Sequence, residues 1–233
     1  MTVVGRVAAL WRYPVKSMAA EELDAAGISW HGLAGDRRWA FIRDGQVHSG
    51  FPWLTIRELP ELAGYRPRFA EPDRPEASVT VVRTPAGREL DVADPELAAE
   101  LGPGIGVIKQ HRGVFDTMPL SLLTTQTLAS LGRLVGTELA ALRFRPNLLV
   151  EASGRGFPED AWVGRVLRVG GLRMRVDQRD KRCVMVTIDP VSLQRNPAVL
   201  RVITRERDSR LGVYGSIVQP GRVAVGDQVE LEP

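Results

Sequence analysis

The chain has 233 residues, of which 44% are hydrophobic and 25% charged, as in a soluble globular protein with one large domain or two small ones. Its net charge is only +3 and its arginines are scattered, which argues against a nucleic-acid-binding protein. No apolar run approaches the ~20 residues that cross a bilayer, and residues 1–6 lack the apolar core of a signal peptide. We therefore expect a cytoplasmic protein that binds neither membrane nor nucleic acid.

The first part of the chain contains short apolar segments interrupted by Gly, Pro or Asp, a pattern typical of β-strands. Asp44-Gly45 and the segment 84–87 predict hairpin turns, because Gly accepts a positive φ. The polar, proline-rich segment 70–77 predicts a surface loop. The predicted strands are 3–11, 23–26, 27–30, 38–43, 79–83 and 88–92.

The second part continues with short strands and adds two helices. The helices are predicted at 125–134, with Thr124 or Thr125 as N-cap, and at 197–205. Gly170-Gly171 predicts a tight turn between two strands. This composition of elements predicts a mainly β fold with a few helices (α+β), built around a β-barrel. The predicted strands are 105–111, 147–151, 166–169, 172–177, 183–188, 213–218, 223–225 and 228–231.

Two basic segments follow predicted strands near the N-terminus. Lys16 and Ser17 come after a proline that ends the first strand, and an ammonium beside a hydroxyl suits a phosphate. The alternative is an ordinary strand exit with a solvated lysine. In the next segment Asp36 could pair with Arg37 or Arg38 and leave the other arginine to bind an anion, or could form only an exposed ion pair.

A third basic segment flanks the first predicted helix. If residues 143–147 are extended, Arg143 and Arg145 lie on one strand face, so an anion or acid must compensate them if they are buried. Asn147 adds a donor and an acceptor directly after a proline. An ordinary solvated charge run is the alternative interpretation.

The sequence contains few of the residues that common catalytic and metal sites need. His31, His48 and His111 lack metal-ligand spacing, and a nucleophile pair of Cys183 with His111 has no supporting local signature. There is no Gly-x-Ser-x-Gly elbow, no Walker A loop and no Gly-x-Gly-x-x-Gly motif after a strand. These observations leave Cys183 as the main candidate for chemistry.

Cys183 is the only cysteine of the chain. A single thiol forms no internal disulfide and no multi-cysteine zinc site, but it can be one soft metal ligand or one nucleophile. Arg179, Lys181 and Arg182 precede it, and cations favour the thiolate. The alternative is a small buried residue at the start of the apolar strand predicted at 183–188.

Taken in order, these segments resemble the MOSC family, named for the C-terminal domain of molybdenum cofactor sulfurase. Residues 13–17 and 35–39 resemble its N-terminal barrel module, and 121–128, 143–147, 159–162 and 181–183 resemble the MOSC domain itself. Residues 187–190, 211–214 and 226–227 continue the similarity. The resemblance implies a MOSC N-terminal β-barrel-like module at 1–92 and a MOSC domain at 93–233.

The resemblance extends to the mitochondrial amidoxime-reducing component family, whose members bind the molybdenum cofactor, molybdopterin with molybdenum. It implies that Cys183 is the metal ligand at the catalytic centre. Asp180 stands where the family often has a second cysteine, and Met118 where a small polar residue is common. The cofactor-binding residues implied by the resemblance are Lys16, Ser17, Arg37, Asp116, Thr117, Arg145, Asn147 and Tyr214.

The activity implied by the resemblance is that of a molybdenum-dependent oxidoreductase that reduces the N–O bond of a small N-hydroxylated substrate. The sequence has no ferredoxin-like segment, so a separate electron-transfer protein is the expected partner. One alternative is a carrier in which Cys183 bears a persulfide or holds the cofactor for delivery. Another is a MOSC protein that binds a different anionic small molecule and catalyses nothing.

Overall fold

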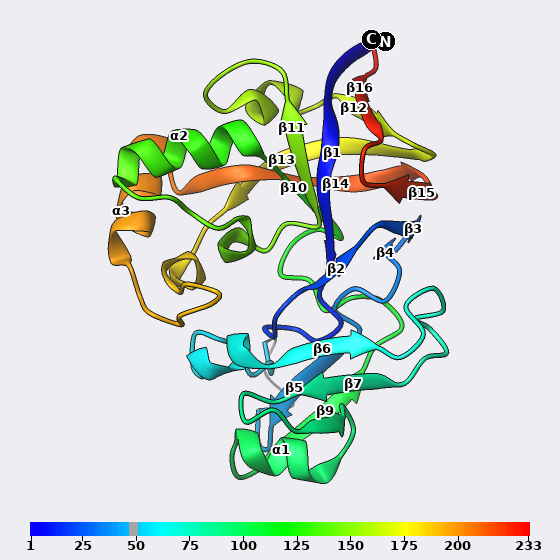
Figure 1. Ribbon diagram of the computed structural model, residues 1–233, viewed down its shortest axis with the longest axis vertical. Helices are drawn as coiled ribbons and strands as arrows, with labels where there is room; N and C mark the ends of the chain where they lie inside the picture. Colours follow the sequence, from blue (N-terminus) through cyan, green and yellow to red (C-terminus); the bar gives the residue numbers. More distant parts are fainter. Residues whose placement is uncertain (47–50) are drawn as a thin grey trace. The chain divides into compact units, whose positions relative to one another are not determined.

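The computed structural model describes residues 1–46 and 51–233. The main chain forms two compact units (Figure 1). The barrel unit contains residues 1–11, 22–34 and 116–233, and the second unit contains residues 12–21 and 35–115. The first strand thus belongs to the same unit as the C-terminal half of the chain.

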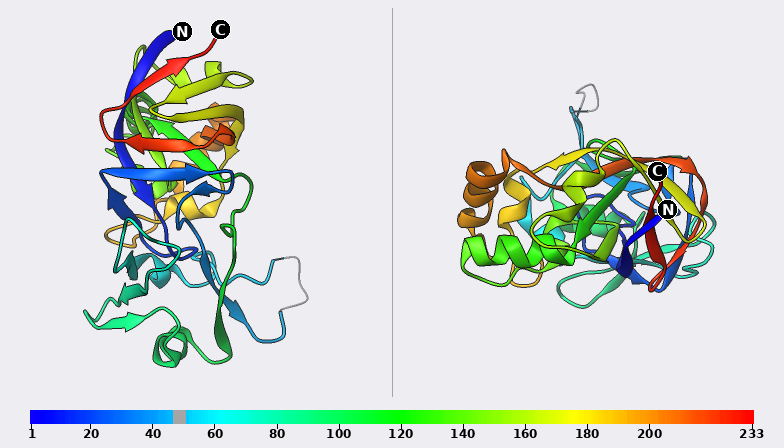
Figure 2. Two further views of the ribbon diagram at one scale, coloured as in Figure 1. Left: turned by 90° about the vertical axis from the view of Figure 1, so that its right-hand side faces the viewer. Right: turned by 90° about the horizontal axis from the view of Figure 1, so that it is seen from above.

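A closed β-barrel dominates the barrel unit. Strand β1 (Thr2–Arg12) pairs with β16 (Gln228–Leu231) on one side and with β11 (Leu148–Ala152) on the other, which closes a ring of seven strands. Thr2 pairs with Leu231, so the two termini lie together (Figure 2). The ring continues through β12 (Val166–Val169), β13 (Leu172–Lys181), β14 (Arg210–Gln219) and β10 (Leu120–Thr124).

Each strand of the ring contributes an apolar side chain to the barrel interior, as alternation along a half-buried strand requires. Gly170, at φ +54° between β12 and β13, accepts the left-handed conformation of the hairpin turn, and a Cβ there would meet Asp227. Fully buried interior residues, one from each strand in chain order, are Leu10, Leu122, Leu148, Leu167, Met174, Val213 and Val229.

Two helices and three 3-10 helices surround a second core in the barrel unit. Helix α2 (Thr125–Val135) begins at Thr124, whose hydroxyl accepts a bond from the Thr127 N–H at 3.1 Å, which confirms Thr124 as N-cap. Helix α3 (Pro197–Arg207) begins at Asn196. The 3-10 helices are η2 (Ala141–Phe144), η3 (Pro158–Trp162) and η4 (Val184–Thr187). The second core includes Leu123, Leu131, Phe144, Val186, Ile203 and Leu211.

The remaining strands form small sheets. In the barrel unit β15 (Gly221–Ala224), β3 (Ala25–Ser29) and β4 (Gly32–Leu33) form one sheet, and β2 (Glu21–Leu23) pairs with β1. In the second unit β5 (Trp39–Arg43) pairs with β9 (Ile105–Lys109). That unit also contains the sheet of β6 (Arg66–Phe69), β7 (Thr80–Arg83) and β8 (Glu89–Asp91), helix α1 (Pro95–Leu101) and 3-10 helix η1 (Pro60–Gly64).

The structure confirms the mainly β fold with a few helices and the closed barrel. The strand predicted at 183–188 is wrong, because residues 184–187 form η4 and only Ile188 makes an isolated bridge, with Arg195. Burial of Val186 in the second core outweighs the β-propensity of this run. None of the helices in the described residues is long and apolar enough to cross a membrane.

Candidate functional site

Cys183 occupies the junction between the end of β13 and the start of η4. Its backbone is extended (φ −127°, ψ −173°), and its carbonyl oxygen accepts the first 3-10 bond from the Val186 N–H at 3.2 Å. The residue is partly exposed, so it is not one of the fully buried core residues. The fold therefore presents this thiol at a helix start rather than in a strand ladder.

Arg182 fixes the main chain directly before the thiol. Its guanidinium donates to the carbonyl oxygens of Phe144 and Leu211, each at 2.8 Å, and lies 2.7 Å from the Asp180 carboxylate. Both charged side chains of this ion pair are almost fully buried, at 7% and 3% exposure. A buried pair with carbonyl partners holds its chain segment in one geometry, and this segment ends at Cys183.

Acids offset part of the positive charge before Cys183, although Asp160 is shared between Arg179 and Arg207. Arg179 lies 3.4 Å from Asp160 and also donates to the carbonyl oxygen of Arg207, while Arg182 pairs with Asp180. The positive charge next to the thiol is consequently smaller than the count of three cations suggests.

Arg143 has a structural role. It lies in η2 and not on a strand, so the prediction that it shares a strand face with Arg145 is wrong. Its guanidinium lies 2.6 Å from Asp189 and donates to the Val186 carbonyl oxygen at 3.3 Å. Burial lowers the pKa of Arg143, and backbone N–H donors, Ser192 first, lower the pKa of Asp189. Asp189 supplies the compensating acid, so Arg143 needs no bound anion.

Asn147 joins three strands of the barrel. It is 1% exposed; its Nδ2 donates to the Trp11 carbonyl oxygen at 3.2 Å, and its Oδ1 accepts from the Ser121 N–H at 3.2 Å and the Ser121 hydroxyl at 3.3 Å. Ser121 in turn pairs with Tyr214 across β10 and β14, and its hydroxyl lies 3.4 Å from the Arg145 carbonyl oxygen. The structure thus brings Arg145, Asn147 and Tyr214 together through Ser121.

Asp116 and Thr117 lie in the loop that precedes β10. Both side chains are exposed, and the loop leads directly into the strand that carries Ser121. The two residues belong to the barrel unit, as do Cys183 and the group around Ser121.

In the second unit, two loops place Lys16, Ser17 and Arg37 side by side. The Arg37 N–H donates to the Tyr13 carbonyl oxygen at 2.7 Å, and the Lys16 N–H donates to the Trp39 carbonyl oxygen at 2.8 Å. Lys16 is only 6% exposed, and its Nζ donates to the Val114 carbonyl oxygen at 3.1 Å. A solvated lysine at an ordinary strand exit does not describe this buried ammonium.

Asp36 organises the same two loops. Its carboxylate accepts from the Tyr13 N–H at 2.7 Å and forms an ion pair with Arg37, whose guanidinium lies 4.5 Å from the Tyr13 ring centroid. Arg38 lies 2.5 Å from Glu76 and donates to the Gln110 carbonyl oxygen at 2.6 Å. Both Arg37 and Arg38 therefore have acidic partners in the protein, Asp36 and Glu76. The pairing of Asp36 with one arginine does not leave the other without an acid.

Three of the predicted site residues have left-handed backbones. Ser17, Arg37 and Arg145 have φ values of +69°, +50° and +53°, a conformation that costs of order 1 kcal/mol for residues with a Cβ. In the described ranges 1–46 and 51–233, only three other non-glycine residues have positive φ. Such strain is concentrated at functional sites, which supports a binding role for these loops.

No group of three or more His, Cys, Asp or Glu side chains in the described part of the chain could hold a metal ion. His48 lies outside the described residues. A metal bound at Cys183 would thus need further ligands from a cofactor, and a cofactor that brings two sulfurs of its own meets this requirement.

Sequence reasoning missed Ser121, Glu159 and the positioning role of Arg182. Glu159 is 0% exposed, and its Oε2 accepts from the hydroxyls of Thr124 and Thr127, each at 2.7 Å. Burial raises its pKa. The Thr124 N-cap was the available signal, because a helix start attracts a carboxylate.

Comparison with known proteins finds two domains of one family, which together match most of the chain. The MOSC N-terminal beta barrel domain matches residues 4–100, and the MOSC domain matches residues 109–230. The YUAD protein from Bacillus subtilis has a similar fold, with a TM-score of 0.54 at 14% identity over 98% of this chain and 95% of that chain.

Two curated relatives are similar over nearly the whole chain. Molybdenum cofactor sulfurase from Drosophila erecta is 26% identical over 95% of this chain, but this chain spans only 32% of its length. Mitochondrial amidoxime-reducing component 1 from Homo sapiens is 24% identical over 98% of this chain and 83% of its own length. Since the MOSC domain alone matches more than half of the residues, the chain belongs to the MOSC domain family.

Proposed function

We propose that this chain binds the molybdenum cofactor with Cys183 as the protein ligand of molybdenum, and reduces N–O bonds in N-hydroxylated substrates. The observation that carries the proposal is the presentation of Cys183: a partly exposed thiol at the start of η4, directly after a segment fixed by Arg182. The similarity to amidoxime-reducing component 1 and to molybdenum cofactor sulfurase supports a function related to this cofactor.

The donor set suits the cofactor better than a metal held by protein alone. One soft thiolate complements two cofactor sulfurs and leaves positions open for oxygen. The cofactor is anionic, and Lys16 supplies a buried ammonium. Ser17 and Arg37 flank it on strained loops. These three residues, with Asp116, Thr117, Arg145, Asn147 and Tyr214, are our proposed cofactor contacts.

When bound, the molybdenum centre would supply the two-electron chemistry that removes oxygen from nitrogen, with electrons from a separate protein. The residues of this chain hold the proposed contacts in position and compensate the negative charge of the cofactor. Arg182 holds the main chain before Cys183 through two carbonyl bonds, and Asn147 fixes the strand junction beside Arg145. Lys16 keeps its ammonium oriented through the Val114 carbonyl oxygen.

The proposal is tested by metal and pterin content in a host that makes the cofactor. We expect close to one molybdenum and one pterin per wild-type chain, and at least a tenfold loss of molybdenum in Cys183→Ala. Val184→Ala is the matched control, since it truncates the neighbouring side chain and keeps the thiol. Wild-type protein without molybdenum, or a Cys183→Ala variant with unchanged molybdenum, would contradict the proposal.

The same samples separate the enzyme from a carrier. Similarity to molybdenum cofactor sulfurase over 95% of this chain favours a carrier as second candidate, in which Cys183 bears a persulfide. A mass increase of about 32 Da on Cys183, the mass of one sulfur atom, without bound pterin would support it. Turnover of benzamidoxime by the molybdenum-loaded chain with a chemical reductant would support the reductase instead.

A further inference from the structure

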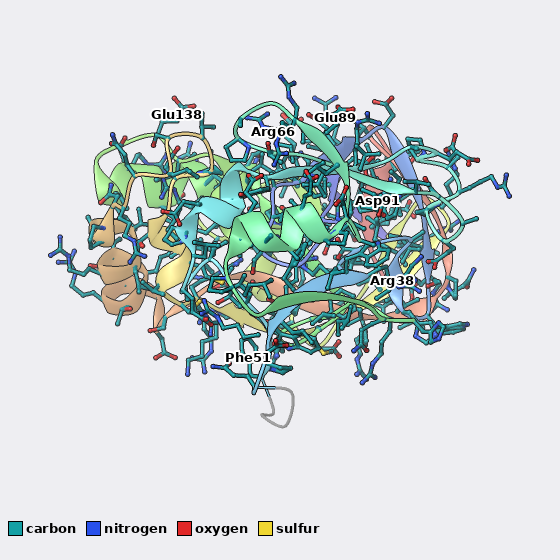
Figure 3. The ribbon with its side chains drawn as sticks, turned by 90° about the horizontal axis from the view of Figure 1, so that it is seen from below. Arg38, Phe51, Arg66, Glu89, Asp91 and Glu138 are labelled. Carbon is teal, nitrogen blue, oxygen red and sulfur yellow. The ribbon has the colours of Figure 1, made fainter. Side chains whose placement is uncertain are left out.

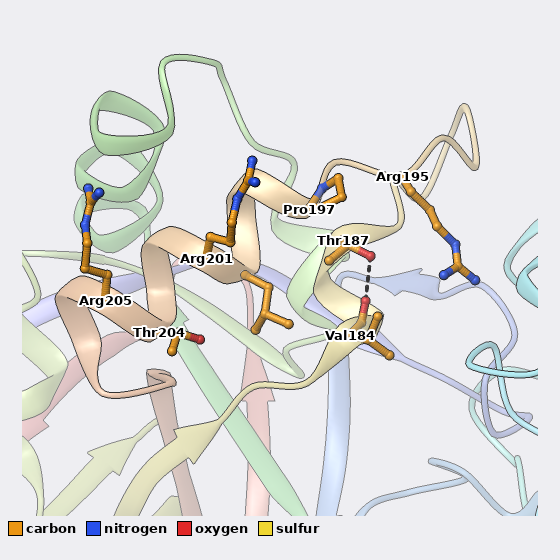
Figure 4. A pocket seen from close by; sticks show the side chains of 8 residues that line it. Val184, Thr187, Arg195, Pro197, Arg201, Thr204 and Arg205 are labelled. Carbon is orange, nitrogen blue, oxygen red and sulfur yellow. Dashed lines mark hydrogen bonds between the residues drawn. The ribbon is translucent and has the colours of Figure 1, made fainter.

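A pocket of about 450 Å³ opens next to Val184, the residue that follows Cys183 (Figure 4). It lies wholly in the barrel unit, between η4 and α3. None of its lining residues belongs to the proposed cofactor contacts. Its lining consists of Val184, Thr187, Arg195, Pro197, Leu200, Arg201, Thr204 and Arg205.

The spacing of these residues explains why they share one surface. On α3 the lining positions are 197, 200–201 and 204–205, which recur every three or four residues and therefore lie on one helix face. On η4 Val184 and Thr187 are three residues apart, one turn of a 3-10 helix. The Thr187 hydroxyl donates to the Val184 carbonyl oxygen at 2.7 Å, so this polar group is already satisfied.

The pocket combines an apolar lining with unbalanced positive charge. Val184, Pro197 and Leu200 supply apolar surface, while no acidic residue lines the pocket. Arg205 lies 2.6 Å from Glu206. The guanidinium groups of Arg195 and Arg201, by contrast, form no ion pair or hydrogen bond with any of residues 1–46 and 51–233. Figure 4 shows Arg201 and Arg205 extending from the same side of α3, with Arg195 beyond Thr187.

We propose that this pocket binds a small organic carboxylate with an apolar body, such as an aromatic acid. A pocket of this size accommodates a small-molecule ligand, and apolar surface with a few charged groups is the usual composition of such a site. The body buries its surface against Val184, Pro197 and Leu200. A planar guanidinium of Arg195 or Arg201 binds a carboxylate with two parallel hydrogen bonds. This site goes beyond the proposed function, because it requires neither the cofactor nor the thiol.

Binding of 2-naphthoate to the full chain, followed by isothermal titration calorimetry at low salt, tests the inference. We expect saturable binding at one site, and roughly tenfold weaker binding in Arg201→Gln or Arg195→Gln, as the loss of one charge-assisted hydrogen-bonding group implies. Thr204→Trp should block the pocket and abolish binding, with the fold checked by circular dichroism. The neutral analogue 2-naphthamide should bind about tenfold more weakly than 2-naphthoate to the wild type.

Arg222→Gln is the matched control. Arg222 is an exposed arginine on β15 in the same unit, outside the pocket lining, so its loss removes the same net charge. Its binding of 2-naphthoate should equal that of the wild type. Absence of binding, equal affinity for acid and amide, or equal losses in Arg222→Gln and Arg201→Gln would each overturn the inference. Binding that persists in molybdenum-free Cys183→Ala protein would support it even where the proposed function fails.

Discussion

The Arg182 guanidinium donates to the Phe144 carbonyl oxygen at 2.8 Å and so joins the segment before Cys183 to the segment before Arg145. The ring of Phe144 lies 5.6 Å from the same guanidinium and packs in the second core. One buried arginine therefore sets the relative positions of two proposed cofactor ligands within the barrel unit, although it is not itself one of them.

Replacing Arg182 should strongly destabilise the fold, because its charged side chain is almost fully buried. Arg182→Ala removes an ion-pair partner of the buried Asp180 carboxylate and two bonds to carbonyl oxygens, and we expect a loss of about 3 kcal/mol in the free energy of unfolding. Urea titration followed by circular dichroism measures this loss. Molybdenum content should fall even under conditions where the variant is folded, because Cys183 loses its positioning.

Arg210→Ala provides the control for that substitution. Arg210 pairs with Asp208, but both side chains are exposed, at 43% and 80%, and exposed pairs contribute ~0–1 kcal/mol. Its stability should stay close to that of the wild type. Equal losses in the two variants would show that the buried network around Arg182 has no special role.

Asn147→Asp should strongly destabilise the barrel. The substitution replaces the Nδ2 donor that faces the Trp11 carbonyl oxygen by a carboxylate oxygen, in a position that is 1% exposed. We expect a loss of about 2–4 kcal/mol at pH 7, since a buried donor bond becomes a repulsive contact and a charge is buried. Thermal unfolding at several pH values measures it, with recovery expected at acidic pH.

The matched change is Asn196→Asp at the start of α3. There the side chain accepts from the Ala198 N–H at 3.1 Å, and a carboxylate caps a helix as well as an amide does. Stability should change by less than about 0.5 kcal/mol. Equal changes in stability in Asn147→Asp and Asn196→Asp would show that the Asn147 amide does not hold the strand junction.

The sequence pattern predicts a strand, cap or turn correctly where the local preference of the residues agrees with their packing in the fold. Six of the seven barrel strands, the Thr124 cap of α2 and the hairpin turn at Gly170 could be predicted. Strand β10 was not predicted, because all five of its residues are buried and it lacks the alternation of a half-buried strand. The 3-10 helix after Cys183 could not be predicted either. Its apolar residues favour a strand, whereas Val186 packs into a core formed by distant segments.

The site residues divide in the same way. The sequence predicts the basic and polar residues of the proposed site but not their partners, because pairing depends on contacts between distant segments. Asp189 compensates Arg143 from 46 positions away, and Val114 accepts from Lys16 across 98 positions. The count of cations before Cys183 likewise omitted Asp180, which pairs with Arg182, and Asp160, which Arg179 shares with Arg207.

Glu159→Gln should stabilise the chain at neutral pH. Burial raises the pKa of Glu159 above its ordinary value of 4.5, so the folded state favours the protonated form. Its contribution to stability is fully present below that ordinary value and is lost as the pH rises through the raised folded value. The neutral amide removes this loss, and we expect a Tm increase of ~2–4 °C at pH 8 that disappears near pH 4.

Glu138→Gln is the control for the pH series. Glu138 is exposed, as is visible in Figure 3, and its neutralisation should leave the Tm unchanged at both pH values. A Tm difference between wild type and Glu159→Gln that does not vary with pH would contradict the protonation argument and point to packing alone.

Ser17→Gly separates backbone strain from cofactor binding. Ser17 has a φ of +69°, which glycine adopts without a Cβ penalty, so removal of the side chain should change stability by no more than about 1 kcal/mol. The hydroxyl is a proposed cofactor contact, and its loss should lower molybdenum and pterin content several-fold at unchanged fold. Asp208→Gly is the control, since Asp208 is the left-handed C-cap of α3 at φ +54° and no proposed contact. It should retain full cofactor content.

The outcome for Ser17→Gly decides whether Ser17 belongs to the site. If this variant also retains full molybdenum and pterin content, Ser17 is not a cofactor contact, and its left-handed backbone reflects loop geometry alone.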